Sequence, residues 1–155
     1  MMSLSRCFVA SVLTLSLCAS ALAQTPDEKA KARDVIWAKE KGIYENRAKG
    51  NLQFYVDNTS DHYVGWPPGA AKPLPLTGLK EDAKRMVGLT KEKLTMELTD
   101  FAMSGTTGVI YYTTKRSMKP DGKPVDETFE VVHVWNKEGA EWKLVGAMAR
   151  AQPQR

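Results

Sequence analysis

The sequence predicts an α+β domain in which helices cover one face of a curved antiparallel sheet. Helical patterns dominate the chain as far as about residue 87, with one short strand among them, and strand-like alternation of apolar and polar residues fills the rest. The stretch Glu130–Arg150, EVVHVWNKEGAEWKLVGAMAR, reads as two long strands joined by the turn Asn136–Gly139. The whole chain has 155 residues, which suits one domain with a single core.

The first helix is expected over residues 26–49. Thr25 and Glu28 have the spacing of a capping box, and Pro26 suits the first helical position. Gly50 supplies the residue that commonly ends a helix. The later elements are expected as a helix over 52–56, a strand over 62–66, a loop rich in proline and glycine up to Thr77, a helix over 78–87, and strands that start at Lys93 and Val109.

Glu40 interrupts the apolar stripe of the first helix. Its spacing from Ile36 and Ile43 places the carboxyl on or beside the buried face. Two interpretations follow: a carboxyl in a pocket with a raised pKa, or an exposed or salt-bridged glutamate. The general exposure of glutamates favours the second interpretation.

The strand before the final turn is apolar on both faces. His133 shares one face with Val131 and Trp135, whereas Val132 and Val134 lie on the other. A strand of this kind is covered on both sides, by helices or by another subunit. His133 is either an acid–base group near neutral pH or a packed histidine, and we favour packing, with a dimer interface as one place for it, because only one face lines the interior.

Residues 1–23 are expected to form a secretory signal peptide. Arg6 precedes the apolar run Phe8–Leu17, which is short for a membrane span, and Ala21–Ala23 has the small-x-small pattern of a cleavage site before Gln24. An uncleaved anchor is the alternative. Cys18 would suit a lipoprotein, but Leu17 stands where a small residue is expected. The sequence therefore predicts a periplasmic or secreted protein cleaved between Ala23 and Gln24, without stable membrane insertion afterwards.

Both cysteines, Cys7 and Cys18, lie in that segment. The chain after Ala23 therefore offers no disulfide, no thiolate metal site and no cysteine nucleophile. The net charge of +4 comes from interspersed lysines, arginines and acids, which does not predict nucleic-acid binding. Motifs such as HExxH, GxSxG, the P-loop and the dinucleotide fingerprint are absent from the sequence, and we expect no metal and no cofactor.

Several segments together resemble the nuclear transport factor 2-like superfamily, and within it the SnoaL-like and ketosteroid-isomerase-like branch. These are YENRAKGN at Tyr44–Asn51, the strand end Trp66–Gly69, the helix start at Gly78, and VWNKEGAEWKLV at Val134–Val145. The resemblance covers residues 24–155. It implies a cone-shaped sheet of the cystatin-like roll type, with helices that close a deep, mainly apolar pocket, frequently in a homodimer that pairs sheets.

The isomerase activity of that branch finds little support in these residues. The resemblance implies a basic carboxylate just before the proline that follows the first strand, where this chain has Trp66 before Pro67. It also implies an acidic hydrogen-bond donor at the position of Val131 or Val132. Tyr44 is only an approximate counterpart of the family tyrosine. With two of three roles unfilled, proton abstraction by that set of residues is not expected.

The predicted pocket draws on aromatic side chains of the segments that close the cone and on the final hairpin. Its expected lining is Trp37, Tyr44, Tyr55, Tyr63, Trp66, Val132, Val134 and Met148. Catalytic candidates are Glu40, Tyr44 and His133. Four charged residues, Glu97, Arg116, Glu130 and Arg150, either cluster at the mouth of the cone or are unrelated charges on its rim.

We therefore expect a pocket protein that holds a small apolar or amphipathic molecule, with no assigned chemistry. The first alternative is an enzyme of the same fold, a lyase, isomerase or hydrolase that uses general acid–base catalysis. The second is a dimerisation module with a vestigial pocket.

Overall fold

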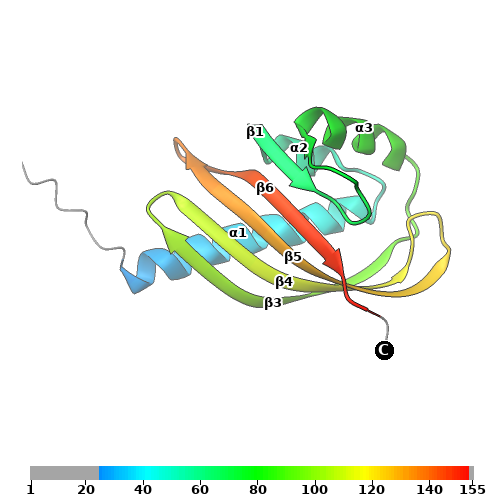
Figure 1. Cartoon of the computed structure of the whole chain (residues 1–155). Helices are drawn as coiled ribbons and strands as arrows, with labels where there is room; N and C mark the ends of the chain where they lie inside the picture. The colour runs from blue at the N-terminus through cyan, green and yellow to red at the C-terminus, as the bar shows by residue number, and fades with distance from the viewer. Residues whose placement is uncertain (1–24, 154–155) are drawn as a thin grey trace, which may run out of the picture.

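The structure is a computed structural model that describes residues 25–153, so the predicted signal peptide and its cleavage point between Ala23 and Gln24 lie outside the described residues. Three helices and six strands follow one another in a single α+β unit (Figure 1). Their order is α1 (Pro26–Arg47), α2 (Gln53–Asp57), β1 (Thr59–Trp66), β2 (Leu74–Pro75), α3 (Leu76–Met86), β3 (Lys93–Ser104), β4 (Thr107–Met118), β5 (Pro124–Glu138) and β6 (Glu141–Ala151). The predicted fold class is confirmed.

The six strands form one curved sheet in the order β2-β1-β6-β5-β4-β3. Strands β3 to β6 are a meander of antiparallel hairpins, as the sequence predicts. The sheet is nevertheless mixed, because β1 pairs parallel to β6. No hairpin links these two strands, so chain connectivity does not impose an antiparallel pairing on them. The short β2 was not expected; it pairs with β1 at Val64 and Gly65.

Helix α1 begins where the sequence predicts. The side-chain oxygen of Thr25 accepts from the backbone N–H of Glu28 at 3.2 Å, and the Glu28 carboxylate accepts from the backbone N–H of Thr25 at 2.9 Å. The helix ends two residues earlier than expected, at Arg47. Gly50 follows with φ of 70°, a left-handed conformation that suits glycine. None of the described helices is long and apolar enough to cross a membrane.

Helix α1 lies across one face of the sheet, which we call the inner face, while α2 and α3 cover the end beside β1 (Figure 1). Gly108 on β4 permits this close approach: a Cβ atom there would lie only 2.9 Å from Cδ1 of Ile36. The core fills the space between α1 and the inner face. Its most deeply buried apolar side chains are Ile36, Ile43, Ile110, Tyr112, Val131, Trp135 and Leu144.

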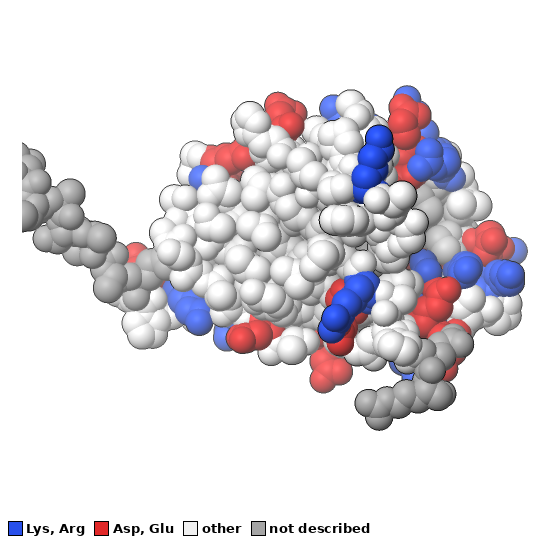
Figure 2. All heavy atoms as spheres, in the orientation of Figure 1, with Lys and Arg blue, Asp and Glu red and all other residues white. Residues whose placement is uncertain are grey.

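The opposite, outer face of the sheet carries no helix of the described chain. Register places Val132 beside Tyr111 and Met148, and Val134 beside Val109 and Gly146, so these side chains share the outer face. The sheet lies in front of α1 in Figure 1, and Figure 2 shows its outer face with a broad uncharged centre bordered by charged residues.

Candidate active site

Glu40 is buried completely between α1 and the sheet, with 0% of its surface exposed. The exposed glutamate favoured from the sequence is therefore wrong, whereas the salt-bridged alternative matches the 2.8 Å contact of Oε1 with Nδ1 of His133, an ion pair when that ring is protonated. The spacing from Ile36 and Ile43 carries the carboxyl to the inner face, as the helical stripe indicated. Its location is compatible with folding because polar partners surround it, as buried charges require.

Three side chains from β4 and β5 lie within hydrogen-bonding distance of the Glu40 carboxylate. The indole Nε1 of Trp135 donates to Oε1 at 2.7 Å, and the hydroxyl of Tyr112 donates to Oε2 at 2.8 Å. Nδ1 of His133 lies 2.8 Å from Oε1 and 3.0 Å from Oε2. Indole N–H is only a donor, so the group it faces must accept. An ionised, acceptor-only Glu40 satisfies all three partners at once.

His133 is held in one orientation by this carboxylate. Its ring is 5% exposed and stands edge-on to Tyr112, with 5.6 Å between the ring centroids. An ionised Glu40 can only accept, so the proton of this contact then lies on Nδ1 and Nε2 of the neutral ring is left as an acceptor. Within residues 25–153, no group forms a hydrogen bond with Nε2. His133 therefore carries a free basic nitrogen on an oriented ring.

Four tyrosines surround this pair as protonated hydroxyls. The hydroxyls of Tyr44 and Tyr112 are 3.5 Å apart, and those of Tyr55 and Tyr63 are 3.4 Å apart. Burial raises the pKa of Tyr44 and of Tyr63, and it raises the pKa of Tyr55 and of Tyr112 well above the ordinary value. All four therefore remain hydrogen-bond donors at neutral pH.

His133 lines a cavity of about 150 Å³, which we call the His133 chamber. Tyr44, Tyr55 and Tyr63 face it together with Ala147 and Ala149, whose small side chains leave room beside the histidine. The remaining lining residues are Arg47, Leu52, Gly65, Trp66, Pro67, Pro68, Leu74, Leu79, Asp82, Val131 and Met148.

A second space of about 370 Å³, the Arg116 chamber, continues from the first. Both are bounded by Tyr44, Arg47 and Val131. The remaining lining residues are Leu52, Pro67, Pro68, Asp82, Arg85, Met86, Leu89, Leu94, Thr114, Arg116, Phe129 and Ala149. The two chambers adjoin each other, since they share these lining residues, and their walls are mainly apolar with ionic groups at the wider end.

The arginines of this wider end are held by a buried carboxylate. The Glu92 side chain is 1% exposed, and its oxygens lie 2.7 Å from Nε of Arg47 and 3.4 Å from Nη1 of Arg116. Nε of Arg116 also donates to Glu127 at 2.8 Å, and this hydrogen bond lowers the pKa of Glu127. Both guanidinium groups are thus fixed by ion pairs.

Five of the predicted lining residues border the chambers. Tyr44, Tyr55 and Tyr63 do so from the interior. Trp66 and Met148 lie at the edge, because both belong to the outer face and are about half exposed, 46% and 51% respectively.

The other three predicted lining residues do not border the chambers. Trp37 packs beneath them on Tyr112, with 5.6 Å between ring centroids. Val132 and Val134 lie on the outer face, because their neighbours Val131 and His133 face α1. The alternation of the strand was read correctly, but sequence alone does not state which of its two faces α1 covers.

The expected cluster at the mouth of the cone forms only in part. Arg116 lines the chamber, but Arg150 pairs with Glu130 on the outer face. Glu97 does not line either chamber. Sequence reasoning missed Arg47, Glu92 and Tyr112 as members of the site. Arg47 ends α1, Glu92 lies in the segment before β3 and Tyr112 lies in β4, and no local pattern indicates the partners that they meet.

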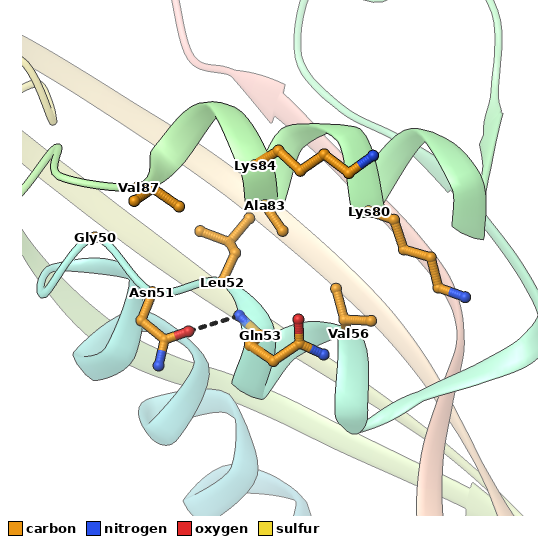
Figure 3. A pocket seen from close by; sticks show the side chains of 9 residues that line it. All are labelled: Gly50, Asn51, Leu52, Gln53, Val56, Lys80, Ala83, Lys84 and Val87. Carbon is orange, nitrogen blue, oxygen red and sulfur yellow. Dashed lines mark hydrogen bonds between the residues drawn. The ribbon is translucent and has the colours of Figure 1, made fainter.

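A separate hollow of about 360 Å³ lies between α2 and α3 on the outside of the domain (Figure 3). Leu52, Val56 and Val87 form its apolar part, with Lys80 and Lys84 on the α3 side. It holds no carboxylate and no histidine. No group of three or more His, Cys, Asp or Glu side chains in residues 25–153 is arranged to hold a metal ion.

No known family model matches the sequence, and no curated protein matches it. The structure, by contrast, is similar to many solved structures. A nuclear transport factor 2-like protein from Cytophaga hutchinsonii is 18% identical, with a TM-score of 0.61 over 77% of this chain and 98% of the other. A ketosteroid isomerase-like protein from Erwinia carotovora atroseptica is 13% identical, with a TM-score of 0.65 over 84% and 100%.

The CaMKII hub of S. rosetta is also similar, at 21% identity and a TM-score of 0.65 over 77% of this chain and 95% of the hub. Proteins with quite different descriptions thus share one architecture, so the likeness concerns the fold and leaves the chemistry to be argued from the site. Residues 25–153 adopt the nuclear transport factor 2-like fold that the sequence resemblance implied.

Proposed function

We propose that this protein binds a small amphipathic molecule in the two chambers and that His133 exchanges a proton with it. One observation carries this proposal: an oriented histidine with a free Nε2 lines the cavity, and a buried carboxylate holds its other nitrogen. A carboxylate paired with a histidine fixes the tautomer of the ring and stabilises its protonated form. This arrangement favours an acid–base enzyme over a protein that only binds its ligand.

The chemistry that suits the site is a lyase or isomerase reaction in which Nε2 of His133 accepts a proton from carbon or oxygen. The hydroxyls of Tyr44, Tyr55 and Tyr63 then supply hydrogen bonds to an oxygen that gains negative charge. This differs from the isomerase apparatus implied by the resemblance, since Val131 faces the cavity where an acidic donor would be required. Glu40 acts through His133 and is a positioning residue.

The test begins with native mass spectrometry of the protein purified from its own host, which reports any bound molecule and the number of subunits. That molecule is then incubated with the protein in D2O, and proton NMR follows its conversion or its exchange of hydrogen for deuterium. We expect both processes to be lost in His133→Gln. If the bound molecule is unchanged by the wild-type protein, the chain is a binding protein without chemistry. If no molecule is bound and a broad panel of lipophiles gives no thermal shift, the pocket proposal fails.

A homodimer formed through the outer face is a second proposal. Val64, Trp66 and Met148 are exposed by 51%, 46% and 51%, and register places Trp66 beside Met148. Register places Tyr111, Val132 and Val134 on the same face, and Figure 2 shows few charged residues over its centre. Exposed apolar patches of this kind commonly mark protein interfaces, and a two-fold axis would pair the patch with itself. The similarity to a hub structure supports assembly as a role of this fold.

The place of the protein in the cell is also a proposal. Residues 1–23 would direct export to the periplasm or the medium, with cleavage between Ala23 and Gln24. Cell fractionation with N-terminal sequencing of the recovered protein tests it. A mature chain that still begins at Met1 or Met2 would contradict cleavage.

A further inference from the structure

The walls of the Arg116 chamber are unevenly charged. Arg47, Arg85 and Arg116 line the chamber, and Asp82 is the one acidic residue among the described lining residues. Glu92 forms ion pairs with Arg47 and Arg116, and Glu127 forms an ion pair with Arg116. Neither carboxylate lines the chamber. The three arginines and the three carboxylates together are therefore nearly neutral, yet most of the charged groups that line the chamber are guanidinium groups.

Arg47 and Arg116 are fixed as well as charged. Their side chains are 28% and 16% exposed, and both pair with Glu92. Each guanidinium also lies over an aromatic ring, Arg47 at 5.9 Å from the centroid of Tyr44 and Arg116 at 5.1 Å from that of Phe129. Because these side chains are already ordered, they lose less conformational entropy when a ligand binds to them.

Donor capacity remains on these groups. A guanidinium has five N–H donors. Arg47 donates from Nη2 to Glu92 at 3.0 Å, and no group within residues 25–153 accepts a hydrogen bond from its Nη1. Arg116 uses Nε and Nη2 toward Glu127 and Nη1 toward Glu92, which leaves the second hydrogen of each terminal nitrogen. A planar acceptor with two oxygens matches such donors.

We propose that Arg47 and Arg116 bind the carboxylate of an amphipathic acid whose apolar body extends along Val131 toward His133. The inference rests on the proposed function and narrows it to one substrate class. Apolar side chains, among them Leu94, Met86 and Phe129, line the space around the arginines and would contact the body of the ligand. Because Glu92 and Glu127 already offset most of the positive charge, the site takes a monoanion in preference to a dianion such as a phosphate monoester.

The test compares octanoate, 1-octanol and octyl phosphate, three probes with the same apolar chain and different head groups. Dissociation constants are measured for the wild-type protein by titration calorimetry. We expect octanoate to bind about tenfold more tightly than octanol, and more tightly than octyl phosphate, with the preference for the acid reduced by added salt.

Variants then locate the anion. Arg116→Gln and the paired change Arg47→Gln with Glu92→Gln should each abolish most of the preference for octanoate over octanol, by weakening octanoate binding much more than octanol binding. The paired change removes one charge of each sign, so Glu92 is not left buried without a partner. Arg150→Gln serves as the matched control, since Arg150 is 76% exposed on the outer face, and it should retain the full preference. Circular dichroism confirms that each variant is folded.

Each other outcome overturns the proposal in a recognisable way. Equal binding of octanoate and octanol by the wild-type protein removes the anion site but leaves the pocket. A preference that survives in both arginine variants places the carboxylate elsewhere. Tighter binding of octyl phosphate contradicts the choice of a monoanion. Failure of all three probes to bind contradicts the amphiphile pocket itself, whereas loss of proton exchange in His133→Gln is measured independently of these affinities.

Discussion

Nδ1 of His133 on β5 lies 2.8 Å from Oε1 of Glu40 on α1, although 93 positions separate these residues in the chain. The contact joins the first helix to the centre of the sheet and aims the remaining ring nitrogen away from Glu40. Trp135 and Tyr112 complete the hydrogen bonds of the carboxylate, so this pair belongs to the core and to the cavity wall at once.

Removing the Glu40 carboxylate should destabilise the fold strongly. Glu40→Ala leaves the buried donors of Tyr112, His133 and Trp135 without an acceptor, and we expect the free energy of unfolding to fall by about 3–5 kcal/mol. Glu40→Gln keeps one acceptor oxygen and should cost about 1–3 kcal/mol. Urea denaturation measures both. A loss below about 1 kcal/mol for Glu40→Ala would show that the network adds little to stability.

Alkaline pH should destabilise the protein through its buried tyrosines. Burial raises the pKa of Tyr55 and of Tyr112 well above the ordinary value, whereas the unfolded chain loses tyrosine protons near pH 10. The unfolded state therefore binds fewer protons above about pH 10, and the free energy of unfolding falls there while remaining steady below it. Urea denaturation from pH 8 to 11 measures this.

Other groups also titrate in that range. The contribution of Tyr55 is therefore found by comparing the pH dependence of stability in Tyr55→Phe and in the wild-type protein. Removing one buried phenol should reduce the slope of stability against pH above about pH 10 by up to 1.4 kcal/mol per pH unit. A variant with the same slope as the wild-type protein would mean that Tyr55 does not contribute to the alkaline loss.

Gly65 on β1 should be intolerant of any side chain. A Cβ atom at this position would lie 2.0 Å from the hydroxyl of Tyr63, which therefore must move in Gly65→Ala. We expect a cost of about 1–3 kcal/mol and a changed His133 chamber. Gly146→Ala is the matched control, because its Cβ would meet its nearest neighbour, Cβ of Val134, at an ordinary 3.6 Å. Similar melting temperatures for the two variants would contradict the expected crowding.

The proposed dimer makes a prediction about charge on the outer face. Met148→Glu places a carboxylate in the apolar patch and should convert the dimer to a monomer in sedimentation velocity experiments, because a buried unpaired charge is costly. Val35→Glu is the control: Val35 is exposed by 41% but lies on α1. A protein that is already monomeric as wild type, or a Met148→Glu variant that remains dimeric, would exclude this interface.

Local patterns predict most of the elements of this fold, although not the short β2. The capping box at Thr25, the glycine at position 50 and the two-residue alternation of β5 all depend on near neighbours in the chain. The pairing of β1 with β6 does not depend on near neighbours in the chain. A strand is expected from residue 62, but β1 begins at Thr59, because Thr59 pairs with Leu144 of β6.

The site was harder to predict for the same reason. Glu40 stands on the apolar stripe, but the sequence favours an exposed or salt-bridged glutamate, because a carboxylate is buried only when partners satisfy it, and those partners come from β4 and β5. The faces of β5 were separated correctly, but nothing local indicates that His133 faces α1 while Val132 and Val134 face away.

The measurement that tests the account most directly is the tautomer of His133, read by NMR of protein labelled with 15N in its imidazole rings. The chain has two histidines, and the exposed His62 provides an internal reference. In the neutral ring of His133 we predict a proton on Nδ1, held by Glu40, and an unprotonated Nε2 whose signal shifts when a ligand enters the cavity. A proton on Nε2, or a mixture of tautomers like that of His62, would contradict the role proposed for Glu40 and with it the acid–base function.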